Sequence, residues 1–183
     1  MRFAIVSDTH DNIKNFNKII SFLNKEGIDT MLHCGDICHD AIMNDAKQHF
    51  QGDVHYVRGN GDFHLDHIPE KLELELGQDA SEAGSAGSPV SGKKVFMSHY
   101  PDIAKQAAES GKYDLVFYGH THRPWEEKIL VPLKPNGEGG GTCRLINPGE
   151  VAGQRYKPTF AIYDTKTEKL ELKILEKLEL DNG

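Results

Sequence analysis

The stretch FAIVSDTHDN, residues 3–12, contains the transition that decides the fold. Residues 3–6 are an apolar run without a polar break, which predicts a strand that is covered on both faces. A polar segment follows, and from Ile13 apolar residues recur at helical spacing until Gly27. The order strand, polar loop, helix predicts the start of a βαβ unit.

The same order recurs along the first two thirds of the chain. Residues 31–34 and 54–57 predict two further strands, and residues 41–50 predict the helix between them. Residues 94–97 and 115–118 predict two more strands, separated by a short helix within residues 101–110. Each of these strands runs into a polar loop. Ligands of such sheets bind beyond the carboxyl ends of the strands, so we expect the functional site there.

The last third of the chain has a different pattern. Residues 129–133, 142–146 and 159–164 predict short strands, which indicates a mixed sheet with antiparallel later strands. Leu170, Leu172 and Ile174 alternate with charged residues, although Leu170, Ile174 and Leu178 also fit a helix; the preceding turn residues favour a hairpin. Residues 77–92 and 136–142 are rich in small residues and predict surface loops.

Length and composition limit the possible classes of protein. A chain of 183 residues suits one domain spanning residues 1–183. No apolar run is long enough for a membrane span, and the N-terminus lacks the features of a signal peptide, so we expect no membrane contact and a cytoplasmic location. The net charge of -7 argues against long nucleic acids as partners. Three cysteines without a second pair favour buried thiols over a zinc knuckle.

Seven residues with side chains that can bind a metal follow five successive predicted strands. They are Asp8, His10, Asp36, Asn60, His99, His120 and His122. A single histidine after a strand is more often a cap or a surface residue, but seven such donors at five strand ends are hard to explain in that way. In Asp8-x-His10 and His120-x-His122, residues two apart on an extended backbone reach toward the same side. Seven donors exceed what one ion uses and suit two ions that share a carboxylate, for which Asp36 is central.

The motifs that carry these residues resemble those of the calcineurin-like metallophosphoesterases, and of their small single-domain phosphodiesterases in particular. They are DTH at residues 8–10, CGDIC at 34–38, RGNGD at 58–62, SHY at 98–100 and GHTH at 119–122. The resemblance extends from Met1 to about Tyr163, with the motifs in the order found in the family. It implies a four-layer α/β/β/α sandwich made of two mixed sheets with flanking helices.

The resemblance also implies a division of the donors between two metal ions. Asp8, His10 and His122 would hold the first ion and Asn60, His99 and His120 the second, with Asp36 bridging them. The reaction it implies is hydrolysis of small phosphodiesters through a metal-bound hydroxide. Mixed imidazole and carboxylate ligands suit manganese, zinc, iron, nickel or cobalt, and the family favours Mn²⁺. The family often forms homodimers.

Four residues near these motifs have separate expectations. Asp62 is expected to support catalysis by fixing a loop or a neighbouring ligand. Asn12 and Arg123 are candidates for contacts with the substrate. Many members of the family have a histidine at the position of Gly61, where it protonates the leaving group. Glycine has no proton to give, so His64, His67 or, as we expect, water would take that role.

Three other functions compete with a phosphodiesterase. A phosphomonoesterase would use the same motifs, and the sequence alone does not separate the two. A noncatalytic scaffold resembling a retromer subunit would be expected to have degraded ligands, whereas all seven are present here. A metal-dependent amide hydrolase also places histidine pairs after strands, but its barrel usually needs about 250 residues.

Overall fold

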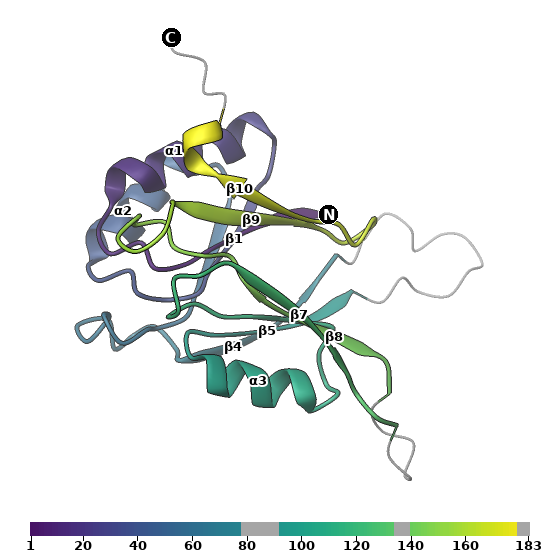
Figure 1. Ribbon diagram of the computed structural model, residues 1–183. Helices are drawn as coiled ribbons and strands as arrows, with labels where there is room; N and C mark the ends of the chain where they lie inside the picture. The colour runs from purple at the N-terminus through teal and green to yellow at the C-terminus, as the bar shows by residue number, and fades with distance from the viewer. Residues whose placement is uncertain (78–91, 134–139, 179–183) are drawn as a thin grey trace.

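Two five-stranded sheets pack face to face between helices in the computed structural model, which describes residues 1–77, 92–133 and 140–178. Helices α1 (Ile13–Lys25) and α2 (Asp40–His49) cover the outer face of one sheet, and α3 (Pro101–Glu109) covers the outer face of the other (Figure 1). These are the four layers that the family resemblance implies. The predicted loop at 77–92 and the predicted loop at 136–142 lie mostly outside the described residues.

The first sheet has the strand order β10-β9-β1-β2-β3. Its strands are β1 (Arg2–Val6), β2 (Thr30–His33), β3 (Asp53–Tyr56), β9 (Thr159–Asp164) and β10 (Leu170–Ile174). Strands β1, β2 and β3 are parallel to one another, whereas β9 runs antiparallel to β1 and to β10. The C-terminal alternation therefore forms a strand of a hairpin, as its preceding turn residues predict.

The second sheet has the strand order β4-β5-β6-β8-β7. Its strands are β4 (Lys71–Leu76), β5 (Lys93–Ser98), β6 (Leu115–Phe117), β7 (Trp125–Leu130) and β8 (Thr142–Asn147). Strands β5, β6 and β8 are parallel, and the edge strands β4 and β7 are antiparallel to their neighbours. A short 3-10 helix, η2 (Leu175–Lys177), follows β10.

One predicted strand is shifted along the chain, and one strand of the structure was not predicted. The strand expected at 129–133 is β7, which spans Trp125–Leu130. The prediction starts too late because β7 is a solvent-exposed edge strand, and its charged residues do not show the apolar pattern of a buried strand. Strand β4 is not among the predicted strands, although its KLELEL alternation is a strand signal.

The strand period of two divides the apolar residues among three cores. In β1, Ala4 and Val6 pack toward α1 and α2, whereas Phe3 and Ile5 face the second sheet. In β5, Phe96 belongs to the core beneath α3. Because β1 and β2 are buried between the helices and the second sheet, their carboxyl ends are held in place, and the polar loops that follow them start from fixed positions. None of the helices in the described ranges has the length and apolar character that crossing a membrane requires.

Candidate metal centre

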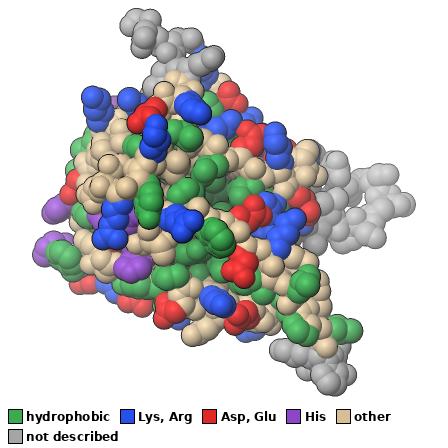
Figure 2. Space-filling model, viewed as in Figure 1, with side chains coloured by type: hydrophobic (Ala, Val, Ile, Leu, Met, Phe, Trp, Pro, Cys, Tyr) green, Lys and Arg blue, Asp and Glu red, His purple; other side chains and the backbone are tan. Residues whose placement is uncertain are grey.

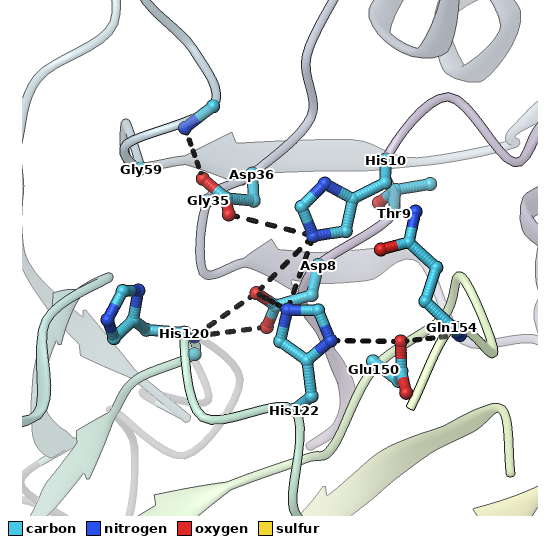
Figure 3. Close-up of polar contacts among 12 residues, drawn as sticks. Asp8, Thr9, His10, Gly35, Asp36, Gly59, His120, His122, Glu150 and Gln154 are labelled. Atoms are coloured by element: carbon cyan, nitrogen blue, oxygen red, sulfur yellow. Dashed lines mark hydrogen bonds and ion pairs between the residues drawn. The ribbon is translucent and has the colours of Figure 1, made fainter. Parts of the chain in front are cut away.

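The loops after β1, β2, β3, β5 and β6 converge at one end of the two sheets. Two of them are joined along their backbones: the Asp8 N–H donates to the Gly35 carbonyl at 3.0 Å, and the His10 N–H donates to the Asp36 carbonyl at 3.0 Å. Figure 3 shows the side chains of Asp8, His10, Asp36 and His122 directed toward a common centre. The seven predicted donors are thus brought together from five parts of the chain.

This convergence requires an unusual backbone. In the described part of the chain, eight residues other than glycine have positive φ, and seven of them lie in these loops. These seven are Asp8, His10, Asp11, Asp36, Cys38, His120 and His122. Each left-handed residue with a side chain costs on the order of 1 kcal/mol, so the surrounding fold must hold them in place. Strain of this kind concentrates at functional sites.

Four of the donors form a compact cluster, which we call the acidic group: Asp8, His10, Asp36 and His122. One ligand atom from each residue lies within 4.8 Å of the others. His122 Nε2 lies 3.4 Å from Asp8 Oδ1, and His10 Nε2 lies 3.3 Å from His122 Nε2. Both carboxylates are buried, at 0% and 2% exposure for Asp8 and Asp36.

The other three donors form what we call the neutral group: Asn60, His99 and His120. Asn60 Oδ1 lies 3.2 Å from His99 Nε2 and 2.9 Å from His120 Nδ1. His99 Nδ1 lies 2.8 Å from the Cys34 carbonyl, which orients its Nε2 toward Asn60. His99 is buried, whereas Asn60 and His120 are exposed.

Asp36 connects the two groups through different oxygen atoms. Its Oδ2 lies 3.6 Å from His10 Nε2 in the acidic group, and its Oδ1 lies 3.5 Å from His99 Nε2 in the neutral group. This is the placement that a bridging carboxylate needs.

The electrostatics of the acidic group fit a bound cation. Burial, with the nearby Asp36 charge adding to it, raises the pKa of Asp8 to about 8. Burial also lowers the pKa values of His99 and His122, which keeps both imidazoles neutral and able to bind a metal. Buried carboxylates beside neutral imidazoles make a donor set for a divalent ion, whose charge would replace the proton on Asp8.

Asp62 fastens the loops that carry the donors. Its buried carboxylate accepts hydrogen bonds from the backbone N–H groups of Asp36 at 2.9 Å, Cys38 at 2.7 Å and Gly59 at 2.7 Å. It thereby joins the loop after β2 to the loop after β3. This contact pattern agrees with the supporting role expected for Asp62.

Both glycines around Asn60 sit against the Asp36 carboxylate. A Cβ atom at Gly59 would lie 2.3 Å from Asp36 Oδ1, so no side chain fits there. The Gly61 N–H donates to the same oxygen at 2.7 Å, and a Cβ atom at Gly61 would lie 3.2 Å from that oxygen and from Cys38 Sγ. His64 and His67 are exposed on the following segment.

The two candidate substrate residues make other contacts. Asn12 is the N-cap of α1, where its Oδ1 accepts the Asn15 N–H at 3.0 Å and its Nδ2 donates to the Ala152 carbonyl at 2.9 Å. The guanidinium of Arg123 stacks over the Trp125 ring at 5.7 Å from its centroid. Their proposed contacts with substrate remain predictions.

Glu150 is a residue of the site that the sequence analysis missed. It is fully buried, and its Oε2 lies 3.0 Å from His122 Nδ1 (Figure 3). The same carboxylate accepts the N–H groups of Gln154, Arg155 and Tyr156. Burial opposes its ionisation, but these three hydrogen bonds lower the pKa of Glu150, which therefore carries its charge. No motif pairs Glu150 with His122 in the sequence, because the two residues are 28 positions apart.

Comparisons with known proteins show the family of this chain. A family model described as the calcineurin-like phosphoesterase superfamily domain matches residues 1–168. The chain belongs to this superfamily. Phosphodiesterase MJ0936 of Methanocaldococcus jannaschii is 28% identical over 179 residues, which cover 96% of this chain and 100% of the relative. The family and the α/β sandwich implied by the sequence motifs are thus confirmed.

Solved structures extend the comparison. The structure of an archaeal phosphodiesterase superposes with a TM-score of 0.73 at 25% identity, covering 95% of this chain and 99% of that one. Vps29 from Entamoeba histolytica has a TM-score of 0.63 at 16% identity, covering 95% of this chain and 99% of that one. At that identity, the likeness to Vps29 shows the fold alone.

Proposed function

We propose that this protein is a metal-dependent phosphodiesterase that hydrolyses small phosphodiesters. The observation that carries the proposal is the placement of Asp36, whose two oxygens face the acidic group and the neutral group separately. Membership of the phosphoesterase family and the similarity to a phosphodiesterase along 96% of the chain support it.

Each part of the site has a task in this reaction. Asp8, His10 and His122 would hold one ion, Asn60, His99 and His120 the other, and Asp36 both. Two such ions, when bound, lower the pKa of a water molecule and neutralise charge on the phosphoryl group. The chain itself supplies the fixed geometry, since Asp62 fastens the loops after β2 and β3, and Glu150 orients the His122 ring.

The donor chemistry narrows the choice of ions. Imidazole and carboxylate donors favour manganese, iron, zinc, nickel or cobalt over calcium, which prefers an all-oxygen shell. We propose Mn²⁺ as the native metal. Metal analysis of the purified protein, followed by activity after reconstitution with each ion, tests this choice.

The site provides no side chain at position 61 to protonate a leaving group. The Gly61 N–H is used by Asp36, and the histidines that follow are exposed. We propose that water supplies this proton, so that substrates with poor leaving groups react slowly.

The test of the proposed function is a direct comparison of two ester classes. The protein loaded with Mn²⁺ should hydrolyse bis-p-nitrophenyl phosphate with a higher kcat/KM than p-nitrophenyl phosphate. The reverse order would indicate a phosphomonoesterase. A fully loaded protein that cleaves neither ester would favour a noncatalytic scaffold.

We further propose that the protein acts in the cytoplasm on small substrates and forms a homodimer. The net charge of -7 supports small substrates over long nucleic acids, since such a chain repels the phosphate backbone. Light scattering coupled to gel filtration measures the oligomeric state directly.

A further inference from the structure

His33 is a buried histidine outside the donor set. It is the last residue of β2 and has no exposed surface. Figure 2 shows histidine side chains gathered at one edge of the molecular surface, whereas His33 lies inside the protein. Two aromatic rings hold its imidazole in place: the Tyr56 centroid lies 5.7 Å away, and Phe16 meets it edge-on at 6.2 Å. A polar ring in such a position requires hydrogen-bond partners for its nitrogens.

Both ring nitrogens of His33 have partners in the two loops that follow β1 and β2. Nδ1 lies 3.2 Å from the backbone nitrogen of Gly35, whose N–H can only donate, so Nδ1 is the acceptor. The proton of the neutral ring is therefore on Nε2, which donates to Thr9 Oγ1. Burial lowers the pKa of His33 to about 4, although the nearby Asp62 charge opposes this shift, so the ring is neutral near pH 7.

Thr9 is the residue through which this contact reaches the metal donors. It is fully buried and lies between Asp8 and His10, both of which have a left-handed backbone, with φ angles of 53° and 41°. Because such residues favour other conformations when nothing restrains them, a fixed residue between them determines where the two donor side chains point. Figure 3 shows Thr9 beside His10 and Gly35 beside Asp36. One imidazole thus restrains the loop of Asp8 and His10 and the loop of Asp36.

We propose that His33 is a positioning residue of the metal centre, which holds Asp8 and His10 in metal-binding geometry through its hydrogen bond to the Thr9 hydroxyl. The inference rests on the proposed function, because it takes the acidic group as a metal site, and it adds two residues outside the donor set. It differs from a purely structural role in one respect. Loss of the contact should weaken binding of the ion in the acidic group and leave the ion in the neutral group unaffected.

Metal titration of matched Thr9 variants tests the inference without turnover. Mn²⁺ is titrated by calorimetry into the metal-free protein. Thr9→Val removes the hydroxyl and leaves the Nε2–H of His33 without its acceptor, so affinity for the ion in the acidic group should fall about 10-fold or more. The backbone hydrogen bonds of Asp8 and His10 to the loop after β2 keep the loops joined in this variant. Thr9→Ser keeps the hydroxyl and should restore most of the affinity.

The second binding step and a control variant separate positioning from general destabilisation. The donors of the neutral group lie on other loops, so affinity for the second ion should stay at the wild-type value in Thr9→Val. Thr30→Val is the matched control, because Thr30 is a buried threonine at the opposite end of β2, where its hydroxyl donates to Asp29 Oδ1 at 3.1 Å. This variant may unfold at a lower urea concentration, but it should leave both metal affinities unchanged.

A double-mutant cycle assigns the effect to His33. His33→Phe keeps a ring at this position and removes both nitrogens, so it should weaken binding of the first ion at least as much as Thr9→Val does. If the two residues act through one contact, the double variant should bind the first ion no more weakly than His33→Phe alone. If His33→Phe does not fold, as judged by circular dichroism, the Thr9 and Thr30 variants still decide the role of the contact.

Specific results would overturn the inference. Wild-type affinity for the first ion in Thr9→Val would exclude the positioning contact, and an equal loss in Thr9→Ser would exclude the hydroxyl as its cause. Equal losses in both binding steps, or in Thr30→Val, would indicate a general loosening of the fold. Diester hydrolysis by a protein whose Thr9→Val variant binds metal like the wild type removes this inference and leaves the proposed function intact. The expected losses of affinity in a protein that cleaves no ester remove the proposed function and leave the role of His33 intact.

Discussion

The acidic group and the neutral group differ in charge, burial and internal contacts. The acidic group contains two buried carboxylates, and burial raises the pKa of Asp8 to about 8. The neutral group contains no carboxylate of its own, and two of its residues are exposed. Asn60 Oδ1 is already within hydrogen-bond distance of both of its histidines.

This difference indicates that the two halves of the centre bind metal with different strength. Two buried carboxylates without a cation are energetically unfavourable, so metal binding to the acidic group removes this cost. The neutral group has no carboxylate of its own, so a cation gains less electrostatic energy by binding to it. We therefore expect the acidic group to load first and more tightly, with Asp36 as the residue on which both depend.

The largest expected effect follows from removing the charge of Asp36. Asp36→Asn keeps the size of the side chain but takes the bridging charge from both groups. Activity should fall by roughly 1,000-fold, because metal-based charge stabilisation is worth several kcal/mol. Diester turnover and metal content by mass spectrometry measure the effect. Near-normal turnover with two bound ions would contradict the bridging placement.

The second effect is a pH-dependent stability of the metal-free protein. Folded Asp8 holds its proton up to about pH 8, whereas its ordinary value is 3.8, so the folded state binds more protons between these values. Stability should therefore fall as pH rises through this window, by about 1.4 kcal/mol per pH unit until the slope decreases near pH 8, or about 2 kcal/mol between pH 6 and 8. Urea unfolding with chelator present measures the slope.

Two controls identify the source of that slope. Asp8→Asn removes the titrating group and should flatten the profile, and added Mn²⁺ should stabilise the wild type most at high pH. If the stability of the metal-free wild type does not change between pH 6 and 8, then Asp8 does not hold a proton in the folded state over this range. The acidic group would then not need a cation to balance its buried charge.

The third effect concerns the neutral group alone. His120→Ala removes one exposed donor and leaves the Asn60–His99 contact in place. Affinity for the second ion should fall about 10-fold, while affinity for the first stays at the wild-type value. A calorimetric titration with two resolved steps measures both. Equal losses in the two steps would mean that the groups do not load independently.

The sequence predicts the donors more fully than the structure around them. Asp8, His10 and His122 are visible because polar residues follow apolar strands, and ligands bind beyond the carboxyl ends of such strands. Glu150 could not be predicted, because its partners are the His122 ring, 28 residues away, and three backbone N–H groups. Neither kind of partner produces a pattern in the sequence. The positive φ angles of Asp8 and Asp36 could not be predicted either, because aspartate, unlike glycine, does not indicate a left-handed backbone in the sequence.

The elements of the fold show the same limit. Buried strands such as β1 are predicted because both faces are apolar, and β10 is predicted from its alternation. Strand β7 is shifted in the prediction because residues Glu126 to Lys128 face solvent at a sheet edge, where burial no longer imposes a pattern. Pairing between distant segments, such as β6 with β8, depends on tertiary contacts that local sequence does not encode.

The smallest expected effect lies at Gly61, between the two groups. Gly61→His would introduce a proton donor beside Asn60, but its Cβ atom would lie 3.2 Å from Asp36 Oδ1 and Cys38 Sγ, so the neighbours must shift slightly. We expect kcat/KM for a diester with an alkyl leaving group to rise about threefold relative to that for bis-p-nitrophenyl phosphate, well below the gain from a fully positioned acid. Gly61→Ala adds the same Cβ without a proton and should show no such change in ratio. If histidine and alanine alter both substrates alike, the missing proton donor does not limit this site, and the close packing of Gly61 against the Asp36 carboxylate is then its main role.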